Sequence, residues 1–276
     1  MKQFYIYITC ITALLLYSHI ACSQGNVIIL EGNYQGKVLY VQNPFASGGV
    51  GFCVNEVKVN GNATTDETNS GAFEIDLKAQ NLNIGDKVEI KILYKDGCKP
   101  KVLNPEVLKP RSTFEVLEMT ADKEGILKWK TKLETGKLPY IIEQFRWNKW
   151  VKVGEVQGVG TAATNEYSFK VTPHSGKNQL RVRQTDYSGQ PRVSKSVDFI
   201  SDVTEVEYEP QQKASKEIVF SQKGKAGSSA ETMYEVYDQY GNVVKKGFGP
   251  KIDVSNLPKG NYFLNFDNRM GEFSKR

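Results

Sequence analysis

Histidine and cysteine are the side chains best suited to nucleophilic catalysis or zinc binding, and this sequence holds few of them. Beyond a predicted leader at residues 1–24, the chain contains one histidine, His174, and two cysteines, Cys53 and Cys98. His174 lies in a turn at residues 172–176, where we expect a solvated loop side chain and no Ser-His-Asp relay. Two distant cysteines and one histidine also lack the paired ligand spacing of a zinc site.

Acidic pairs could supply acid–base catalysis or hold calcium, and two occur in polar loops. Asp66 precedes Glu67, and Asp122 lies two positions before Glu124. Neither pair has the regular Asp-x-Asp-x-Asp-Gly spacing of a calcium loop. The glycine-rich segment 47–52, SGGVGF, lacks the Lys-Ser or Lys-Thr and the helix that a phosphate loop requires. We therefore expect no enzymatic activity, no cofactor, no metal and no small-molecule substrate.

Residues 1–24 have the pattern of a signal peptide. Lys2 is the only charge before an apolar run, and small residues follow it. Ile20-Ala21-Cys22 is also a partial bacterial lipobox, so Cys22 is either an acylated first residue or is discarded by cleavage near Gln24. No later segment reaches the roughly 20 apolar residues of a membrane span. The sequence thus predicts an exported chain that is soluble or lipid-anchored.

Export bears on the two remaining cysteines, because disulfides persist in oxidising compartments. Cys53 lies in a predicted strand and Cys98 follows an Asp-Gly turn. The pair could form a disulfide, or both could remain free thiols, since the sequence alone does not place their Cα atoms within bonding range.

The formal charge is mildly positive, with 36 Lys and Arg against 31 Asp and Glu, a net of +5. Removing the leader takes away Lys2 and lowers this net charge to +4, from 5 − 1. The excess is small and scattered along the chain, so it does not indicate a nucleic-acid partner.

Strand-like runs separated by Asn-Gly, Asp-Gly and Pro-containing turns dominate the mature chain. The sequence predicts an all-β protein of three consecutive small immunoglobulin-like or fibronectin-like β-sandwich modules after the signal peptide. The expected modules span residues 25–104, 105–203 and 204–276. In the first, Val88, Ile90 and Ile92 alternate with Glu89 and Lys91, as in a strand with one buried face. This first module resembles carboxypeptidase-regulatory-like and related immunoglobulin-like modules.

The second module contains a predicted hairpin around Trp147-Asn148-Lys149-Trp150, followed by three more strands. It resembles a fibronectin type III domain of secreted Bacteroidetes proteins. The matching residues are Trp150, Val151, Val153, Gly158, Gly160, Tyr167, Phe169, Pro173, Gly176, Asn178, Arg181, Arg183, Asp186 and Gly189. An alternative use of the hairpin is a carbohydrate-binding platform made of Trp147 and Trp150, which requires both rings to be exposed on one face.

The third module follows a polar linker and has turn signals at residues 238–242 and 257–260. It resembles the C-terminal sorting domain of type IX secretion cargo. The resemblance is carried by Tyr237, Asp238, Gly241, Ile252, Asp253, Val254, Leu257, Pro258, Gly260, Tyr262, Phe263 and Gly271. Of the Pro-Asn-Pro element that usually opens the family, only Pro210 is present, and the apolar strand that usually follows the basic pair is missing after Lys275-Arg276.

These departures lead us to expect a sorting-type fold whose last strand is cut short. The first expectation for function is therefore a periplasmic, outer-membrane-associated subunit of the type IX pathway that binds and occludes the outer-membrane translocon as a plug. The alternative is a type IX cargo that acts at the cell surface, or after secretion, as an adhesin or carbohydrate-binding protein. Both expectations are non-catalytic, and the expected partner is a protein, the outer-membrane translocon.

Overall fold

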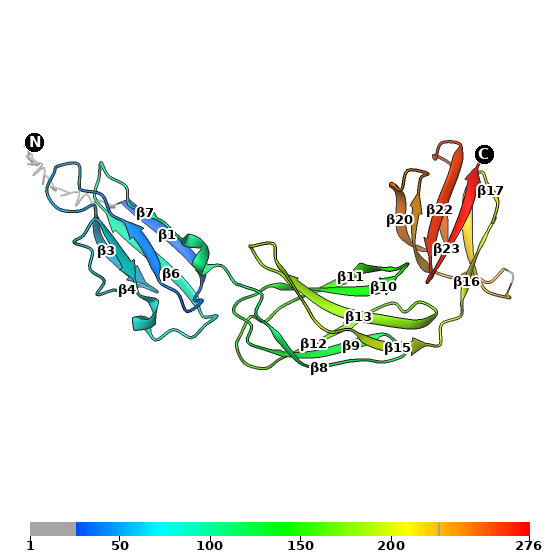
Figure 1. Cartoon of the computed structure of the whole chain (residues 1–276), viewed down its shortest axis with the longest axis horizontal. Coiled ribbons are helices and arrows are strands. Elements are labelled where there is room, and N and C mark those ends of the chain that lie inside the picture. The colour runs from blue at the N-terminus through cyan, green and yellow to red at the C-terminus, as the bar shows by residue number, and fades with distance from the viewer. Residues whose placement is uncertain (1–25, 226) are drawn as a thin grey trace, which may run out of the picture.

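The computed structural model describes residues 26–225 and 227–276, which form an all-β chain of three small sandwiches arranged one after another (Figure 1). The signal peptide and the possible acylation site at Cys22 lie outside the described residues. Within the described residues, no helix is both long and apolar enough to cross a membrane.

The N-terminal sandwich packs a four-stranded sheet, in the order β1-β6-β3-β4, against a three-stranded sheet, in the order β5-β2-β7. Their bounds are β1 Asn26–Asn33, β2 Leu39–Gln42, β3 Val54–Val59, β4 Asn62–Ala63, β5 Ala72–Ile75, β6 Lys87–Tyr94 and β7 Lys101–Val102. The alternation expected along β6 is present, because Val88, Ile90 and Ile92 are all buried in the core.

Two short 3₁₀ turns complete the N-terminal sandwich, η1 at Leu77–Gln80 and η2 at Pro105–Leu108. Leu108 belongs to the buried core of this first sandwich, and Val107 packs against it. A Cβ added at Gly32 on β1 would lie only 2.4 Å from the carbonyl oxygen of Leu108, so η2 packs directly against that strand. The first module therefore extends past the expected boundary at residue 104.

The middle sandwich has one sheet in the order β11-β10-β13-β14, with β15 also paired to β13, and a second in the order β12-β9-β8. The bounds are β8 Glu115–Ala121, β9 Ile126–Lys132, β10 Pro139–Arg146, β11 Lys149–Gln157, β12 Asn165–Lys170, β13 Gly176–Thr185, β14 Pro191–Val193 and β15 Val197–Ser201. Trp129, Tyr140 and Tyr167 pack together in the core with ring centroids 5.0–5.7 Å apart.

The C-terminal sandwich faces a three-stranded sheet, β16-β18-β21, with a five-stranded sheet, β17-β23-β22-β19-β20. The bounds are β16 Val206–Glu209, β17 Lys213–Ala214, β18 Glu217–Gln222, β19 Thr232–Tyr237, β20 Val243–Gly249, β21 Lys251–Asp253, β22 Gly260–Phe266 and β23 Arg269–Lys275. β17 runs parallel to β23, whereas the other pairings in this sandwich are antiparallel.

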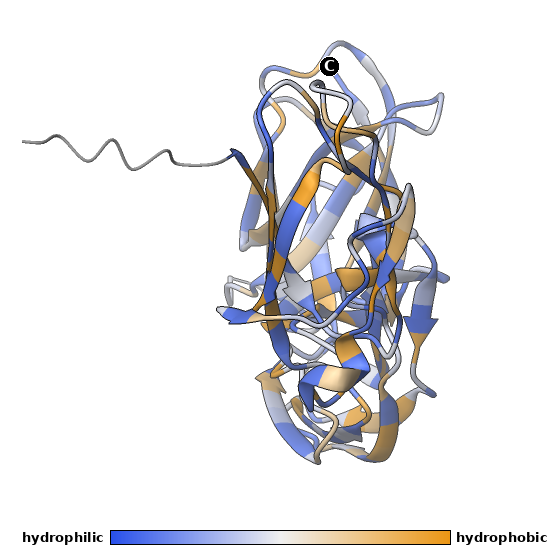
Figure 2. Cartoon of the chain, turned by 90° about the vertical axis from the view of Figure 1, so that its left-hand side faces the viewer, coloured by the Kyte–Doolittle hydropathy of each residue, from blue (hydrophilic) through white to orange (hydrophobic). Residues whose placement is uncertain are grey.

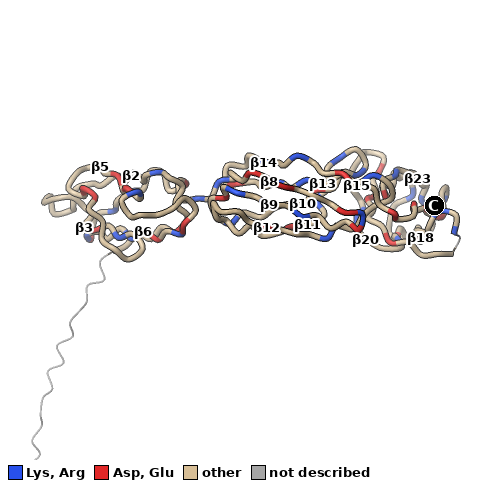
Figure 3. The backbone as a smooth tube through the Cα atoms, turned by 90° about the horizontal axis from the view of Figure 1, so that it is seen from below, with Lys and Arg blue, Asp and Glu red and all other residues tan. Residues whose placement is uncertain are grey.

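Hydrophobic and hydrophilic residues alternate along many of the strands (Figure 2), as expected for sheets with one face in a core and one in solvent. Lysine and arginine are interspersed with aspartate and glutamate along the whole chain (Figure 3). This mixture agrees with the scattered charge of the sequence.

Candidate functional site

The first of the sorting-type residues, Gly241, lies in the turn between β19 and β20. Its φ of 83° is a left-handed conformation that glycine adopts without a steric penalty. The Asp238 carboxylate organises the same turn by accepting hydrogen bonds from the backbone N–H groups of Tyr240 and Asn242, both at 2.9 Å. Hydrogen bonds from the side chain and backbone of Asn242 lower the pKa of Asp238. The motif residues here define a tight turn and supply no reactive group.

The segment Leu257 to Tyr262 forms the second element of the motif, the turn that enters β22. The Leu257 N–H donates to the carbonyl of Val254 at 3.1 Å. The Tyr262 hydroxyl donates to the Pro258 carbonyl at 2.8 Å, while its ring stacks on Phe273 of β23 with centroids 5.4 Å apart. Tyr262 therefore links the turn to the last strand.

Gly271 on β23 is required by the close approach of Tyr208 from β16. A Cβ added at Gly271 would lie 2.7 Å from two atoms of the Tyr208 side chain, its hydroxyl oxygen and a ring carbon. The Tyr208 hydroxyl also donates to the Glu272 carbonyl at 2.9 Å and accepts from the Glu272 N–H at 3.2 Å. This contact joins the two sheets of the C-terminal sandwich, and only glycine leaves room for it.

β23, the last strand of the C-terminal sandwich, is regular up to Lys275. β23 pairs with β22 along its whole length, from Arg269 opposite Phe266 to Lys275 opposite Gly260. Its end is also paired to β17, through Ser274 and Lys275. The side chain of Phe273 on this strand is buried in the core of the sandwich.

The expectation that His174 is a solvated loop residue is also wrong, because only 1% of its surface is exposed. Its Nδ1 lies 2.8 Å from the Ser175 carbonyl oxygen, and its Nε2 is buried without a hydrogen bond of normal geometry. The Ser175 hydroxyl donates to the Asp267 carboxylate, so serine, aspartate and histidine do meet here. They do not form a relay, since the serine is bonded to the aspartate and the histidine does not lie between them.

The alternative of a carbohydrate platform at the β10–β11 hairpin is excluded. Trp147 is only 7% exposed, and its indole N–H donates to the Phe266 carbonyl of the C-terminal sandwich at 3.3 Å. Trp150 is partly buried, with the Arg181 guanidinium 4.1 Å from its ring centroid. The two rings therefore do not form an exposed pair.

Cys53 and Cys98 form a disulfide, with their Cα atoms 5.9 Å apart. The bridge closes the loop region of the N-terminal sandwich where Phe45 stacks on Phe52. The glycine-rich segment 47–52 lies within this loop. It is part of the connection between β2 and β3.

The acidic pairs do not assemble a metal site. No group of three or more histidine, cysteine, aspartate or glutamate side chains gathers within residues 26–225 and 227–276. Asp122 instead accepts from the Ile126 N–H at 2.8 Å and stabilises a turn, and Glu67 accepts from the Asn69 N–H at 2.8 Å.

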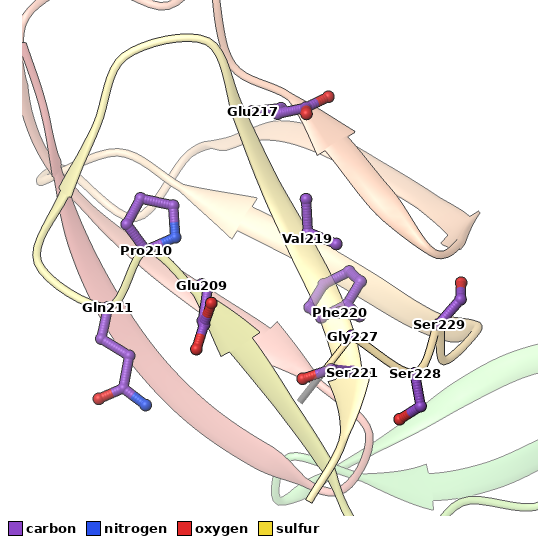
Figure 4. Close-up of a pocket in the computed structure, with 10 residues that line it drawn as sticks. All are labelled: Glu209, Pro210, Gln211, Glu217, Val219, Phe220, Ser221, Gly227, Ser228 and Ser229. Atoms are coloured by element: carbon purple, nitrogen blue, oxygen red, sulfur yellow. The ribbon is translucent and has the colours of Figure 1, made fainter. Parts of the chain in front are cut away.

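An open groove of about 780 Å³ lies on the C-terminal sandwich (Figure 4). Its lining includes Glu209, Glu217 and three serines, but neither a histidine, a cysteine, a lysine nor an arginine among the described residues. Figure 4 shows Glu217 well away from Glu209 along the groove. The groove therefore holds no paired acid and base.

Comparison with known protein families identifies most of the C-terminal sandwich. Residues 214–276 match the family described as the secretion system C-terminal sorting domain. This range contains all twelve residues that carry the sorting-type resemblance and runs through the whole of β23. Residues 214–276 thus form a C-terminal sorting domain of the type IX secretion kind. No curated protein matches the chain.

Among solved structures, the chain is similar to a tetra-tandem repeat in the extending region of a large adhesion protein, at 13% identity and a TM-score of 0.31 over 91% of this chain and 73% of that one. It is also similar to the FN1–FN3 domains of chicken CNTN1, at 13% identity and a TM-score of 0.25 over 91% of this chain and 98% of that one. These scores are too low to carry an argument about function, and the all-β fold rests on the sheets themselves.

Proposed function

We propose that the protein is a non-catalytic cargo of type IX secretion, carried across the outer membrane by its C-terminal sorting domain. The observation that supports this proposal is the match of residues 214–276 to the sorting family. The turns at Gly241 and Pro258 and the glycine at position 271 preserve the fold of that domain. The sorting domain's partner is then the outer-membrane translocon, and the protein acts at the cell surface or after secretion.

The two preceding sandwiches are the delivered part, and we propose that they act as an adhesive module. The loop of the N-terminal sandwich supports this idea, because Phe45 is 64% exposed and Val50 is 82% exposed while the disulfide holds the loop in place. Exposed apolar side chains on a fixed loop suit contact with another protein.

The comparisons favour a cargo over the periplasmic plug expected from the sequence. The plug expectation depended on departures from the sorting pattern, whereas the family match runs from residue 214 through residue 276. Nothing in the family match supports a plug subunit.

Localisation of the chain in a bacterium that has a type IX system tests the proposal. Full-length protein is expected at the cell surface or in the medium, and a chain without residues 204–276 is expected to stay in the periplasm. A chain carrying Glu217→Gln, an exposed substitution in the same domain, serves as the export control. Full-length protein confined to the periplasm and bound to the translocon would instead establish the plug.

A further inference from the structure

Asp267, in the turn between β22 and β23, is buried against the middle sandwich. It is only 1% exposed, and its φ of 48° places it in the left-handed region. The Ser175 N–H donates to one carboxylate oxygen of Asp267 at 2.9 Å, and the Ser175 hydroxyl donates to the other. Hydrogen bonds to a charged acceptor are among the stronger ones in proteins. The sorting domain thus inserts a negative charge into a site built by the preceding module.

Arg146, at the end of β10, supplies the opposite charge. It is 2% exposed and donates to the Asp267 carbonyl at 3.0 Å, to the Thr172 carbonyl at 3.0 Å and to the Gln144 side chain at 2.7 Å. Burial lowers the pKa of Arg146 to about 10, while the Asp267 charge opposes that shift. The guanidinium therefore remains charged at neutral pH, and its buried charge is balanced by the neighbouring aspartate.

The β10–β11 hairpin presents the other half of the contact through its tight turn. Trp147 and Asn148 have φ values of 52° and 60°, the positive values of a type I′ turn. This turn brings the Trp147 indole to the Phe266 carbonyl and brings Lys149 to β19, where its ammonium lies 2.6 Å from the Glu235 carboxylate and 2.7 Å from the Tyr237 hydroxyl. Burial opposes ionisation of Glu235, but the bonds from Lys149 and Tyr237 outweigh it and lower the Glu235 pKa.

The covalent connection between the two sandwiches is short and exposed in comparison. β15 ends at Ser201 and β16 begins at Val206, and residues 202–204 of the connection are exposed. The buried contacts come instead from the hairpin tip and the 173–176 loop on one side and from the β22–β23 turn on the other. The contacts that orient the sorting domain therefore do not depend on the backbone that tethers it.

We propose that the β10–β11 hairpin tip and the 173–176 loop form a docking surface for the β22–β23 turn, and that this surface retains the sorting domain after the connection at residues 202–205 is cut. A buried arginine and a buried aspartate of opposite charge lie at the centre of the contact, with an apolar tryptophan beside them. Such an arrangement favours affinity and a single orientation. The docking is independent of the proposed secretion function, because it needs only the two sandwiches.

The test uses the full mature chain with a site for a sequence-specific protease inserted between Asp202 and Glu205. After cleavage, the two fragments are applied to a sizing column at about 10 µM, a concentration at which a micromolar complex stays associated. The fragments are expected to elute together at the position of the uncut chain. Separate elution of two folded fragments would overturn the proposal.

Asp267→Gly tests the named contact, because glycine keeps the left-handed turn while the carboxylate is lost. The dissociation constant of the cut fragments is expected to rise at least tenfold, since the buried Ser175 N–H loses its acceptor and the buried Arg146 guanidinium loses the nearby negative charge. Ser175→Ala removes the hydroxyl donor on the middle sandwich and is also expected to raise the dissociation constant. Glu217→Gln, on the exposed surface of β18, should leave the dissociation constant unchanged.

Circular dichroism of each released fragment separates loss of docking from loss of folding. If Asp267→Gly and Ser175→Ala both bind as tightly as the unmodified fragments, the contact assigned here does not hold the domains together.

Discussion

Gly271 shows how one residue of the sorting-type motif acts through packing. We expect Gly271→Ala to destabilise the C-terminal sandwich by about 1–3 kcal/mol, as overpacking in a filled core does. The reason is that the new methyl group would lie 2.7 Å from the side chain of Tyr208, the residue that links the two sheets. Urea unfolding measures the change in the unfolding free energy, which is read from the transition of the C-terminal sandwich. Gly48→Ala, at a position with no atom within 4 Å, is the matched control, and equal effects of the two substitutions would contradict the prediction.

We expect His174 to make the stability of the middle sandwich depend on pH. Burial lowers its pKa below the ordinary 6.5, and the nearby Arg146 charge acts in the same direction, against the Ser175 and Phe145 carbonyls and the Asp267 carboxylate. A group with a lowered histidine pKa is neutral in the folded state, so its contribution is complete above pH 6.5 and is lost as the pH falls through that value toward the folded pKa.

The melting temperature is therefore expected to fall between about pH 7.5 and about pH 5.5 more steeply for the unmodified protein than for His174→Gln, since only the former must protonate a buried ring. Thermal unfolding at several pH values provides the measurement. The carboxylates titrate in both proteins. The difference between the two melting curves against pH therefore reports the contribution of His174 alone. Parallel curves would show that this ring does not control the transition.

At the scale of the element, the disulfide is the main local constraint on the N-terminal sandwich. It ties the residue before β3 to the segment after β6 across a sequence separation of 45. A loop of that length corresponds to about 4 kcal/mol in the chain-entropy description. We expect the double variant Cys53→Ala, Cys98→Ala to lower the unfolding free energy of this sandwich by an amount near that value.

Denaturant unfolding with and without a reducing agent measures the effect. The transitions of the middle and C-terminal sandwiches serve as internal controls, because neither contains a cysteine among the described residues. Reduction that moves all three transitions equally would be inconsistent with a local constraint.

Strands and turns were largely predictable from the sequence, whereas contacts between modules were not. The alternation of Val88, Ile90 and Ile92 predicts a half-buried strand, and that strand is β6. The motif around Pro258 likewise indicated the sorting-type module. In contrast, the burial of Trp147 and His174 depends on a turn more than 90 residues later in the chain, as the separation of 92 between Ser175 and Asp267 shows. Local periodicity carries no information about such a contact, so the sequence alone predicts a solvated His174 and leaves an exposed Trp147 open as an alternative.

At the scale of the whole molecule, the two junctions differ in the side-chain hydrogen bonds that cross them. Among the described residues, the first junction is crossed by a side-chain hydrogen bond from Gln35 to the Thr135 carbonyl at 2.5 Å. The second is crossed by bonds from Arg146, Trp147, Lys149 and Ser175, several of them buried and charged. Because opening the second junction would separate paired charges, we expect motion between modules to be concentrated at the first.

Distances between spin labels test this expectation in the intact protein. Labels are placed on cysteines introduced at Glu74 in the first sandwich, Ser168 in the middle one and Glu217 in the last, all exposed positions. The distribution of distances between positions 168 and 217 is expected to be narrow, and the one between 74 and 168 broader. Asp267→Gly should broaden the 168–217 distribution and leave the 74–168 distribution unchanged, since it removes an acceptor only at the junction between the middle and C-terminal sandwiches. Equal widths in the unmodified protein would mean that the buried polar contacts do not set the relative orientation of the modules.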